Sequence, residues 1–208
     1  MKAFVLGLAA TLGAAASSAP ALAAPTVAAV YESGRCMVQR DRRAAINLIL
    51  TLPSDNSPAN LSSLGSACAG AEGATAMLVR GAIAQALFLR DFRVFGREPR
   101  IEVTLVNLDL PVESSSSGSR SVELYRWGDC VVRNDGTGTQ RLLLSAVSSA
   151  DESAAIAGLQ TYMAACMRSG TQLEVRASEL RSVFAQSAYH AMYRYWTGQL
   201  EGGGRGRN

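Results

Sequence analysis

The strongest constraint on the fold of this chain is an internal duplication. Residues 31–41 (YESGRCMVQRD) recur in the second half as residues 125–135 (YRWGDCVVRND), with Tyr, Gly, Cys, Val and Asp at matching positions. Repeated segments fold as copies of one supersecondary unit that pack on each other. Further matches follow along both halves: Leu48 with Leu142, Cys68 with Cys166, Arg80 with Arg176, and Phe88 with Phe184. The sequence therefore predicts two related units.

Each unit has the pattern of three helices. Asp41 and Asp135 are expected to be the N-caps of the first helix, because their carboxylates can accept hydrogen bonds from its first amides. The second helix is expected near 59–68 in one copy and near 152–166 in the other. The third helix carries a stripe of residues at helical spacing in both copies: Met77, Gly81, Ala84 and Phe88, and then Leu173, Ala177, Leu180 and Phe184. We expect a mostly all-α protein whose two units pack pseudo-symmetrically with Phe88 and Phe184 buried.

Two kinds of segment leave room for short strands. Cys36–Val38 and Cys130–Val132 are apolar, and we interpret each as a helix start or an extended lead-in rather than a strand. Between the units, residues 101–105 alternate apolar and polar side chains, which indicates one short strand. The predicted organisation follows in chain order: a first helical unit at 24–92, an inter-unit segment with a Ser-rich linker at 93–121, a second helical unit at 122–200, and a disordered Gly-rich tail at 201–208.

Residues 1–23 have the pattern of a secretory signal peptide. Lys2 supplies the charge, residues 3–12 are apolar, and Ala21-Leu22-Ala23 is a small-x-small cleavage site. We expect cleavage after Ala23 and a periplasmic or secreted protein. Anchoring by an uncleaved signal is the alternative, and no other stretch is long and apolar enough to span a membrane.

Four cysteines in an exported chain predict two disulfides. Antiparallel neighbouring helices place the start of the first beside the end of the second, so we expect Cys36 to pair with Cys68 and Cys130 with Cys166. The chain has no Cys-x-x-Cys and a single histidine. Thioredoxin-like chemistry, haem attachment and a structural zinc site are therefore not expected, and no other metal or cofactor is predicted.

The first unit also resembles exported, uncharacterised proteins of GC-rich Gram-negative bacteria. The resemblance lies in Gly34-Arg35-Cys36-Met37-Val38, in Cys68 and in the segment 79–87 (VRGAIAQAL), and it extends more loosely over the second unit. The second copy departs from the pattern at 177–179. The resemblance implies an envelope location and brings no known activity.

Charge and motifs exclude several functions. The formal net charge is only +3, and no arginine-rich block is present, so nucleic-acid binding is not expected. Residues 136–139 (GTGT) lack the Gly-Lys-Ser/Thr ending of a phosphate-binding loop. We expect a non-catalytic binding or structural protein of the envelope, with an envelope protein or a glycan as its candidate partner.

Six residues are the candidates for function. His190, the single histidine, could serve a small periplasmic hydrolase as base, with Ser178, Ser182 and Ser187 on the same predicted helix. The other interpretation of His190 is a packed or solvated side chain. Arg80 and Arg176 occupy matching positions and could bind a ligand, or hold helix carbonyls through a buried stem. Tyr189, Tyr193 and Trp196 share a helix face that could pack between the units or contact a partner.

Overall fold

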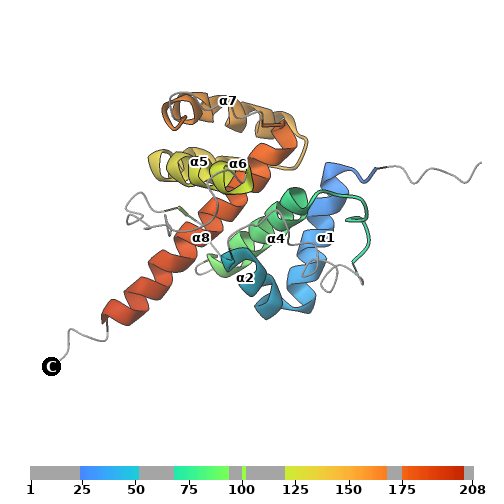
Figure 1. Ribbon diagram of the computed structural model, residues 1–208, viewed down its shortest axis with the longest axis horizontal. Helices are drawn as coiled ribbons and strands as arrows, with labels where there is room; N and C mark the ends of the chain where they lie inside the picture. The colour runs from blue at the N-terminus through green and yellow to red at the C-terminus, as the bar shows by residue number, and fades with distance from the viewer. Residues whose placement is uncertain (1–23, 52–67, 94–99, 102–119, 168–174, 204–208) are drawn as a thin grey trace, which may run out of the picture.

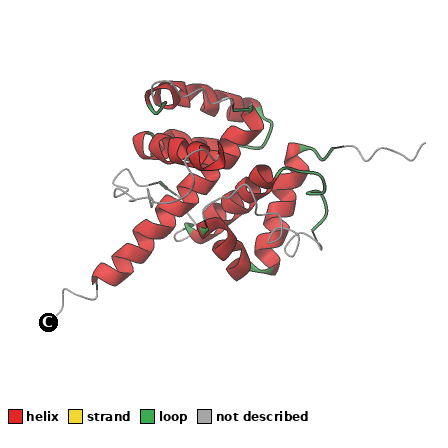
Figure 2. Cartoon of the chain, viewed as in Figure 1, coloured by secondary structure: helices red, strands yellow, loops and turns green. Residues whose placement is uncertain are grey.

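The computed structural model describes residues 24–51, 68–93, 100–101, 120–167 and 175–203. The first half contributes α1 (Val27–Arg40), α2 (Arg42–Leu50) and α4 (Ala76–Asp91). The second half contributes α5 (Arg120–Asn134), α6 (Gly136–Leu144), α7 (Ala150–Ala165) and α8 (Ala177–Gly203). Figure 2 shows helices joined by turns and no strand among these residues. The predicted all-α class is confirmed.

The repeated motif is itself a helix, which the sequence prediction missed. Residues 31–40 lie in α1 and 125–134 in α5, so neither copy is a helix start or an extended lead-in. Gly34 and Gly128 occupy the middle of these helices because neighbouring helices come close. A Cβ at Gly34 would lie 2.6 Å from the backbone of Ala82, and one at Gly128 would lie 2.4 Å from Val183 Cγ1. The second unit thus has four helices rather than three.

The predicted helix caps are confirmed. Asp41 Oδ1 accepts a hydrogen bond from the amide of Ala44 at 2.9 Å, and Asp135 Oδ1 accepts one from the amide of Gly138 at 2.8 Å. Each aspartate therefore ends one helix and begins the next, which sets the sharp corner between α1 and α2 and between α5 and α6.

Both predicted disulfides are confirmed. Cys36 bonds to Cys68 with their Cα atoms 5.9 Å apart, and Cys130 bonds to Cys166 with 5.8 Å between Cα atoms. The first cysteine of each pair lies inside α1 or α5, not ahead of the first helix as expected. Each bond closes a loop within one half of the chain, so the two halves are stapled separately.

Helices α4 and α8 pack against each other at the centre of the molecule (Figure 1), and we call their contact the α4–α8 crossing. Every residue from 79 to 88 and from 181 to 192 is buried. The crossing is tight, because a Cβ at Gly81 would lie 2.3 Å from Ser182 Cα. Phe88 and Phe184 are fully buried, as predicted. The prediction is wrong at the start of the second stripe, because Ala177 is exposed and Leu180 is only half-buried.

The remaining expectations concern the linker and the tail. Ile101 is buried without strand structure and its amide donates to Gln140 Oε1 at 3.2 Å, while 102–105 lie outside the described residues. Also outside them are residues 1–23, Leu173 and most of the helix expected at 59–68. Helix α8 continues to Gly203, so 201–203 are helical rather than disordered. In the part of the chain that the structure describes, no helix has the length and apolarity that crossing a membrane requires.

Candidate functional site

The α4–α8 crossing is built on a pattern that both helices share, an arginine followed five residues later by a glutamine. Arg80 Nε donates to Gln186 Oε1 at 3.1 Å, and Arg181 Nη1 donates to Gln85 Oε1 at 3.1 Å. Each arginine thus holds the glutamine of the opposite half, as a two-fold relation requires. The counterpart of Arg80 is therefore Arg181, and the sequence match with Arg176 was wrong.

Arg176 plays no part in this crossing. It is exposed and precedes α8, where its amide donates to Glu179 Oε2 at 3.0 Å. A binding site that pairs Arg80 with Arg176 is therefore not formed.

Each central arginine also binds the end of a short helix in its own half. Arg80 Nη2 donates to Thr51 O at 2.6 Å, and Arg181 Nη2 donates to Ser145 O at 3.1 Å. Thr51 and Ser145 are the C-caps of α2 and α6. A cation at a helix C-terminus interacts favourably with its unpaired carbonyls and its dipole. Arg80 and Arg181 therefore join helices of the two halves. For Arg80 this is the structural role considered above, in which a buried arginine holds helix carbonyls.

The two sides of the crossing differ in their charges. Arg181 is fully buried and pairs with Glu152 at 2.5 Å. Arg80 is 4 % exposed and has no carboxylate partner among the described residues. Burial lowers the pKa of Arg80 to about 10, which leaves it a cation at neutral pH.

Tyr31 and Tyr125, which occupy matching positions in the repeated motif, also differ in whether they have a partner. Tyr31 Oη lies 3.2 Å from Ser182 Oγ, whereas Tyr125 Oη is buried without a partner in the described part of the chain. The residue equivalent to Ser182 is Gly81, which has no hydroxyl to offer. Desolvation raises the pKa of both phenols, so both are neutral at physiological pH.

His190 is packed into the interface between the halves. It is 3 % exposed, its Nε2 lies 3.4 Å from Leu50 O, and its ring meets the edge of Tyr125 at a centroid distance of 5.6 Å. Burial, more than the nearby Arg194 and Arg80 cations, lowers the pKa of His190 to about 4. The imidazole is therefore neutral at pH 7.

The predicted serines near His190 engage the backbone instead. Ser187 Oγ donates to Tyr125 O at 3.4 Å, and Ser182 Oγ donates to Ser178 O at 3.2 Å. Within the described chain, His190 makes no hydrogen bond with a serine or a carboxylate. The structure thus does not bring the expected nucleophile and base together.

The three aromatic candidates do not form one surface. Tyr189 is fully buried and donates to Asp91 Oδ2 at 3.0 Å, while Tyr193 is half-buried with its ring 6.0 Å from that of Tyr189. Trp196 is 41 % exposed on the part of α8 that extends away from the other helices (Figure 1). The three aromatic side chains therefore pass from the core to the surface along α8.

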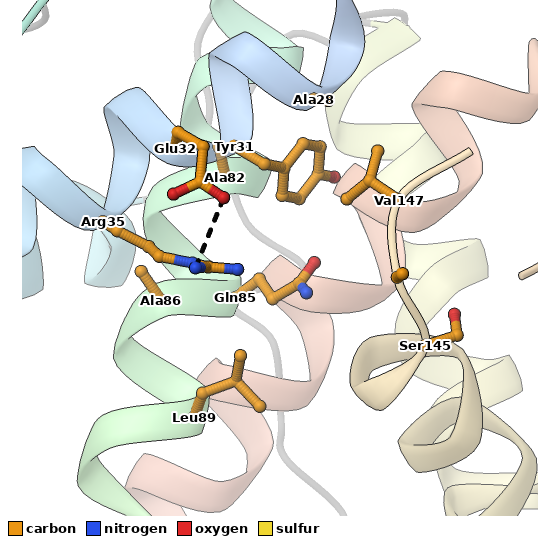
Figure 3. Close-up of a pocket in the computed structure, with 11 residues that line it drawn as sticks. Ala28, Tyr31, Glu32, Arg35, Ala82, Gln85, Ala86, Leu89, Ser145 and Val147 are labelled. Carbon is orange, nitrogen blue, oxygen red and sulfur yellow. Dashed lines mark ion pairs between the residues drawn. The ribbon is translucent and has the colours of Figure 1, made fainter. Parts of the chain in front are cut away.

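A hollow that the sequence did not indicate lies between α1, α4 and the turn after α6. It has a volume of about 240 Å³. Figure 3 shows Arg35 extending from α1 towards Gln85 of α4, whose amide points on towards the turn that carries Ser145 and Val147. Its lining comprises Ala28, Tyr31, Glu32, Arg35, Ala82, Gln85, Ala86, Leu89, Ser145, Ala146 and Val147. We call this hollow the inner pocket.

The polar floor of the inner pocket is fixed from behind by the Arg181 network. Gln85 accepts from Arg181 and donates to Leu143 O at 2.9 Å, while Ser145 Oγ lies 2.6 Å from Arg181 Nη2. At the mouth, Arg35 and Glu32 form an exposed ion pair at 3.3 Å. The floor is therefore pre-organised and the mouth carries charges that are free to exchange partners.

A second hollow of about 370 Å³ continues along the same helices. It is lined by Arg35, Val38, Gln39, Ala86, Leu89, Arg90 and Arg93. The two hollows share Arg35, Ala86 and Leu89, so we treat them as one groove, the α1–α4 groove. The available sequence signal was Ala82, Ala86 and Leu89, which recur at helical spacing on α4 beside the predicted core stripe.

The described residues contain no group of three His, Cys, Asp or Glu side chains that could hold a metal ion. Comparison with protein-family models, with curated proteins and with solved structures finds no match for the chain. The site is therefore interpreted from its own geometry.

Proposed function

We propose that the protein is a non-catalytic binding module that is exported to the bacterial cell envelope. The observation that carries the binding part is the α1–α4 groove, whose adjoining hollows of about 240 and 370 Å³ together reach the size of small-ligand pockets. Its polar floor groups, Gln85 and Ser145, are held in place by Arg181. A floor fixed before binding lowers the entropic cost of taking up a ligand.

Export is supported by the pattern of residues 1–23 and by the two disulfides. These features support a periplasmic or secreted location as part of the proposal. Mass spectrometry of the protein from fractionated cells should find Ala24 as the first residue. A soluble form that retains Met1 would contradict export with cleavage.

Ligand binding is tested by thermal shift with a panel of envelope solutes, glycan fragments and short peptides. Ala86 lines both hollows, so Ala86→Trp should fill the groove and abolish any stabilisation seen with the native protein. Ala157→Trp, on the exposed surface of α7, is the matched control and should respond as the native protein does. The binding role fails if no solute stabilises the protein, or if both variants respond alike.

A small periplasmic hydrolase that uses His190 is the competing proposal. It is supported by the neutral imidazole, which can accept a proton at pH 7, and by Nδ1, which has no partner among the described residues. Loss of a hydrolytic activity in His190→Gln, with ligand binding in the groove unchanged, would favour the hydrolase over the binding module.

A further inference from the structure

Three arginines converge on the outer part of the α1–α4 groove. Arg35 comes from α1, Arg90 from the last turn of α4, and Arg93 from the segment just after it. Among the residues that the structure describes, no acidic side chain lines this part of the groove. Guanidinium groups match the geometry of carboxylate and phosphate oxygens and bind them through paired hydrogen bonds.

These three arginines form fewer or weaker ion pairs than other arginines in the described chain. Four other arginines form ion pairs with carboxylates: Arg42, Arg120, Arg133 and Arg181. No described carboxylate pairs with Arg90 or Arg93, and Arg90 makes only a 3.5 Å contact with Val38 O. The pair of Arg35 with Glu32 leaves these side chains 58 and 66 % exposed, so it contributes little and opens easily.

The acidic residue that follows Arg90 in the sequence is directed elsewhere. Asp91 follows Arg90, but its carboxylate accepts from Arg42 Nε at 2.8 Å and from the Tyr189 hydroxyl at 3.0 Å. With its side chain 8 % exposed, it is held inside the fold by these two partners. It therefore does not neutralise the arginines that face the groove.

Between the charges the groove is apolar. Ala86 and Leu89 line both hollows, Val38 lines the outer one, and Ala82 and Val147 line the inner one. The groove can therefore cover an apolar ligand body while arginines hold one charged end.

We propose that the α1–α4 groove binds small organic anions, with a carboxylate or phosphate held by Arg35, Arg90 and Arg93 and an apolar body lying over Ala86 and Leu89. The inference rests on the proposed binding function and names the ligand class of the same groove. Glu32 gives up Arg35 when the anion binds, and the inner pocket takes the far end of the apolar body.

The test uses four probes that share one alkyl chain: octanoate, octyl phosphate, octanol and octyltrimethylammonium. Titrations of the full mature protein are followed by calorimetry and by the arginine Nε–Hε resonances in NMR spectra. We expect octanoate, octyl phosphate or both to bind and to shift the Arg90 and Arg93 signals. The neutral and cationic probes should bind at least about tenfold more weakly.

Variants separate the arginine contacts from general charge effects. Arg90→Gln and Arg93→Gln should each weaken the anionic probes about tenfold, with little change for octanol. Arg43→Gln removes an exposed arginine of α2 that does not line the groove and should leave binding unchanged. The two anionic probes distinguish a carboxylate ligand from a phosphate ligand.

Binding of octanol as tight as that of both anionic probes, or an equal loss in Arg43→Gln, would overturn the anion proposal while leaving a groove that binds ligands. If none of the four probes binds but another solute binds in an Ala86-dependent way, this inference fails and the proposed function stands. If nothing binds the groove, both fail.

Discussion

The two halves of the molecule place the same groups at the α4–α8 crossing but satisfy them differently. On one side Arg181 binds Gln85, Ser145 and the carboxylate of Glu152. On the other side the equivalent Arg80 binds Gln186 and Thr51. One side is thus a buried ion pair within a hydrogen-bond network, and the other is a buried cation with neutral acceptors.

The difference shows what the duplication preserves and what it leaves free to change. Both halves keep the arginine, the glutamine and the capped end of a short helix, because these form the reciprocal contact between the halves. Among the described residues the counter-ion occurs in one half only, where Glu152 lies in the first turn of α7. The inner pocket lies against the Arg181 side, where Gln85 and Ser145 join the network to the groove.

The largest expected effects are the same in both halves. Phe88 and Phe184 are fully buried, against Phe92 and Trp127 respectively. Truncation to alanine removes buried area and leaves a cavity, so each variant should lower the free energy of unfolding by about 3–5 kcal/mol. Urea denaturation followed by circular dichroism measures this. A loss below about 1 kcal/mol in either variant would mean that the two halves do not share one core.

Replacement of the two arginines should expose the difference between the sides. Arg181→Met leaves the largely enclosed Glu152 carboxylate, whose side chain is 12 % exposed, without its arginine and should cost about 3–5 kcal/mol. Arg80→Met leaves only neutral acceptors unpaired and should cost about 1–3 kcal/mol. Urea unfolding at pH 7 measures the loss of unfolding free energy in both variants. An equal loss in the two variants would show that Glu152 contributes nothing to the asymmetry.

Two double variants provide the control for this comparison. Adding Glu152→Gln to Arg181→Met removes the stranded charge, so it should recover part of the lost stability. Adding Glu152→Gln to Arg80→Met should produce no such recovery, because Arg80 does not contact Glu152.

The halves should also respond differently to acid, because His190 of α8 is matched by the non-titrating Leu89 of α4. Burial lowers the pKa of His190 from 6.5 to about 4. Between these values the unfolded chain binds a proton that the folded chain does not, so stability is lost as pH falls from about 6.5 to 4. His190→Gln should reduce this pH dependence by up to about 3 kcal/mol. The measurement is urea unfolding from pH 7 to pH 4, and an unchanged slope would contradict the buried, neutral histidine.

Much of the local and covalent structure could be predicted from the sequence. The duplication, the Asp41 and Asp135 caps and the disulfide pairs depend on residues that act within one half. The helical motif was missed because Gly34 and Gly128 disfavour a helix when considered alone. The reason for both glycines is the close approach of α4 and α8, which can be seen only in the folded structure.

The register of α8 and the groove depend on contacts between the halves. Arg181 and Gln186 repeat the spacing of Arg80 and Gln85, so a signal was present. The match with Arg176 was favoured because a valine precedes both Arg80 and Arg176 and a phenylalanine follows each eight residues later. The α1–α4 groove combines residues from two helices and, at its inner end, from the turn after α6. No periodicity within one helix could predict that those surfaces meet.

The smallest expected effect compares the motif tyrosines. Tyr31→Phe removes a hydroxyl that contacts Ser182, and Ser182 keeps its bond to Ser178 O, so the cost should be about 1 kcal/mol. Tyr125→Phe removes a buried hydroxyl that has no partner in the described chain, so the change should be neutral or slightly stabilising. Urea unfolding of both variants under identical conditions gives the comparison. If Tyr125→Phe costs as much as Tyr31→Phe, the Tyr125 hydroxyl is satisfied in solution, and the two sides of the crossing then differ only in the counter-ion of their arginines.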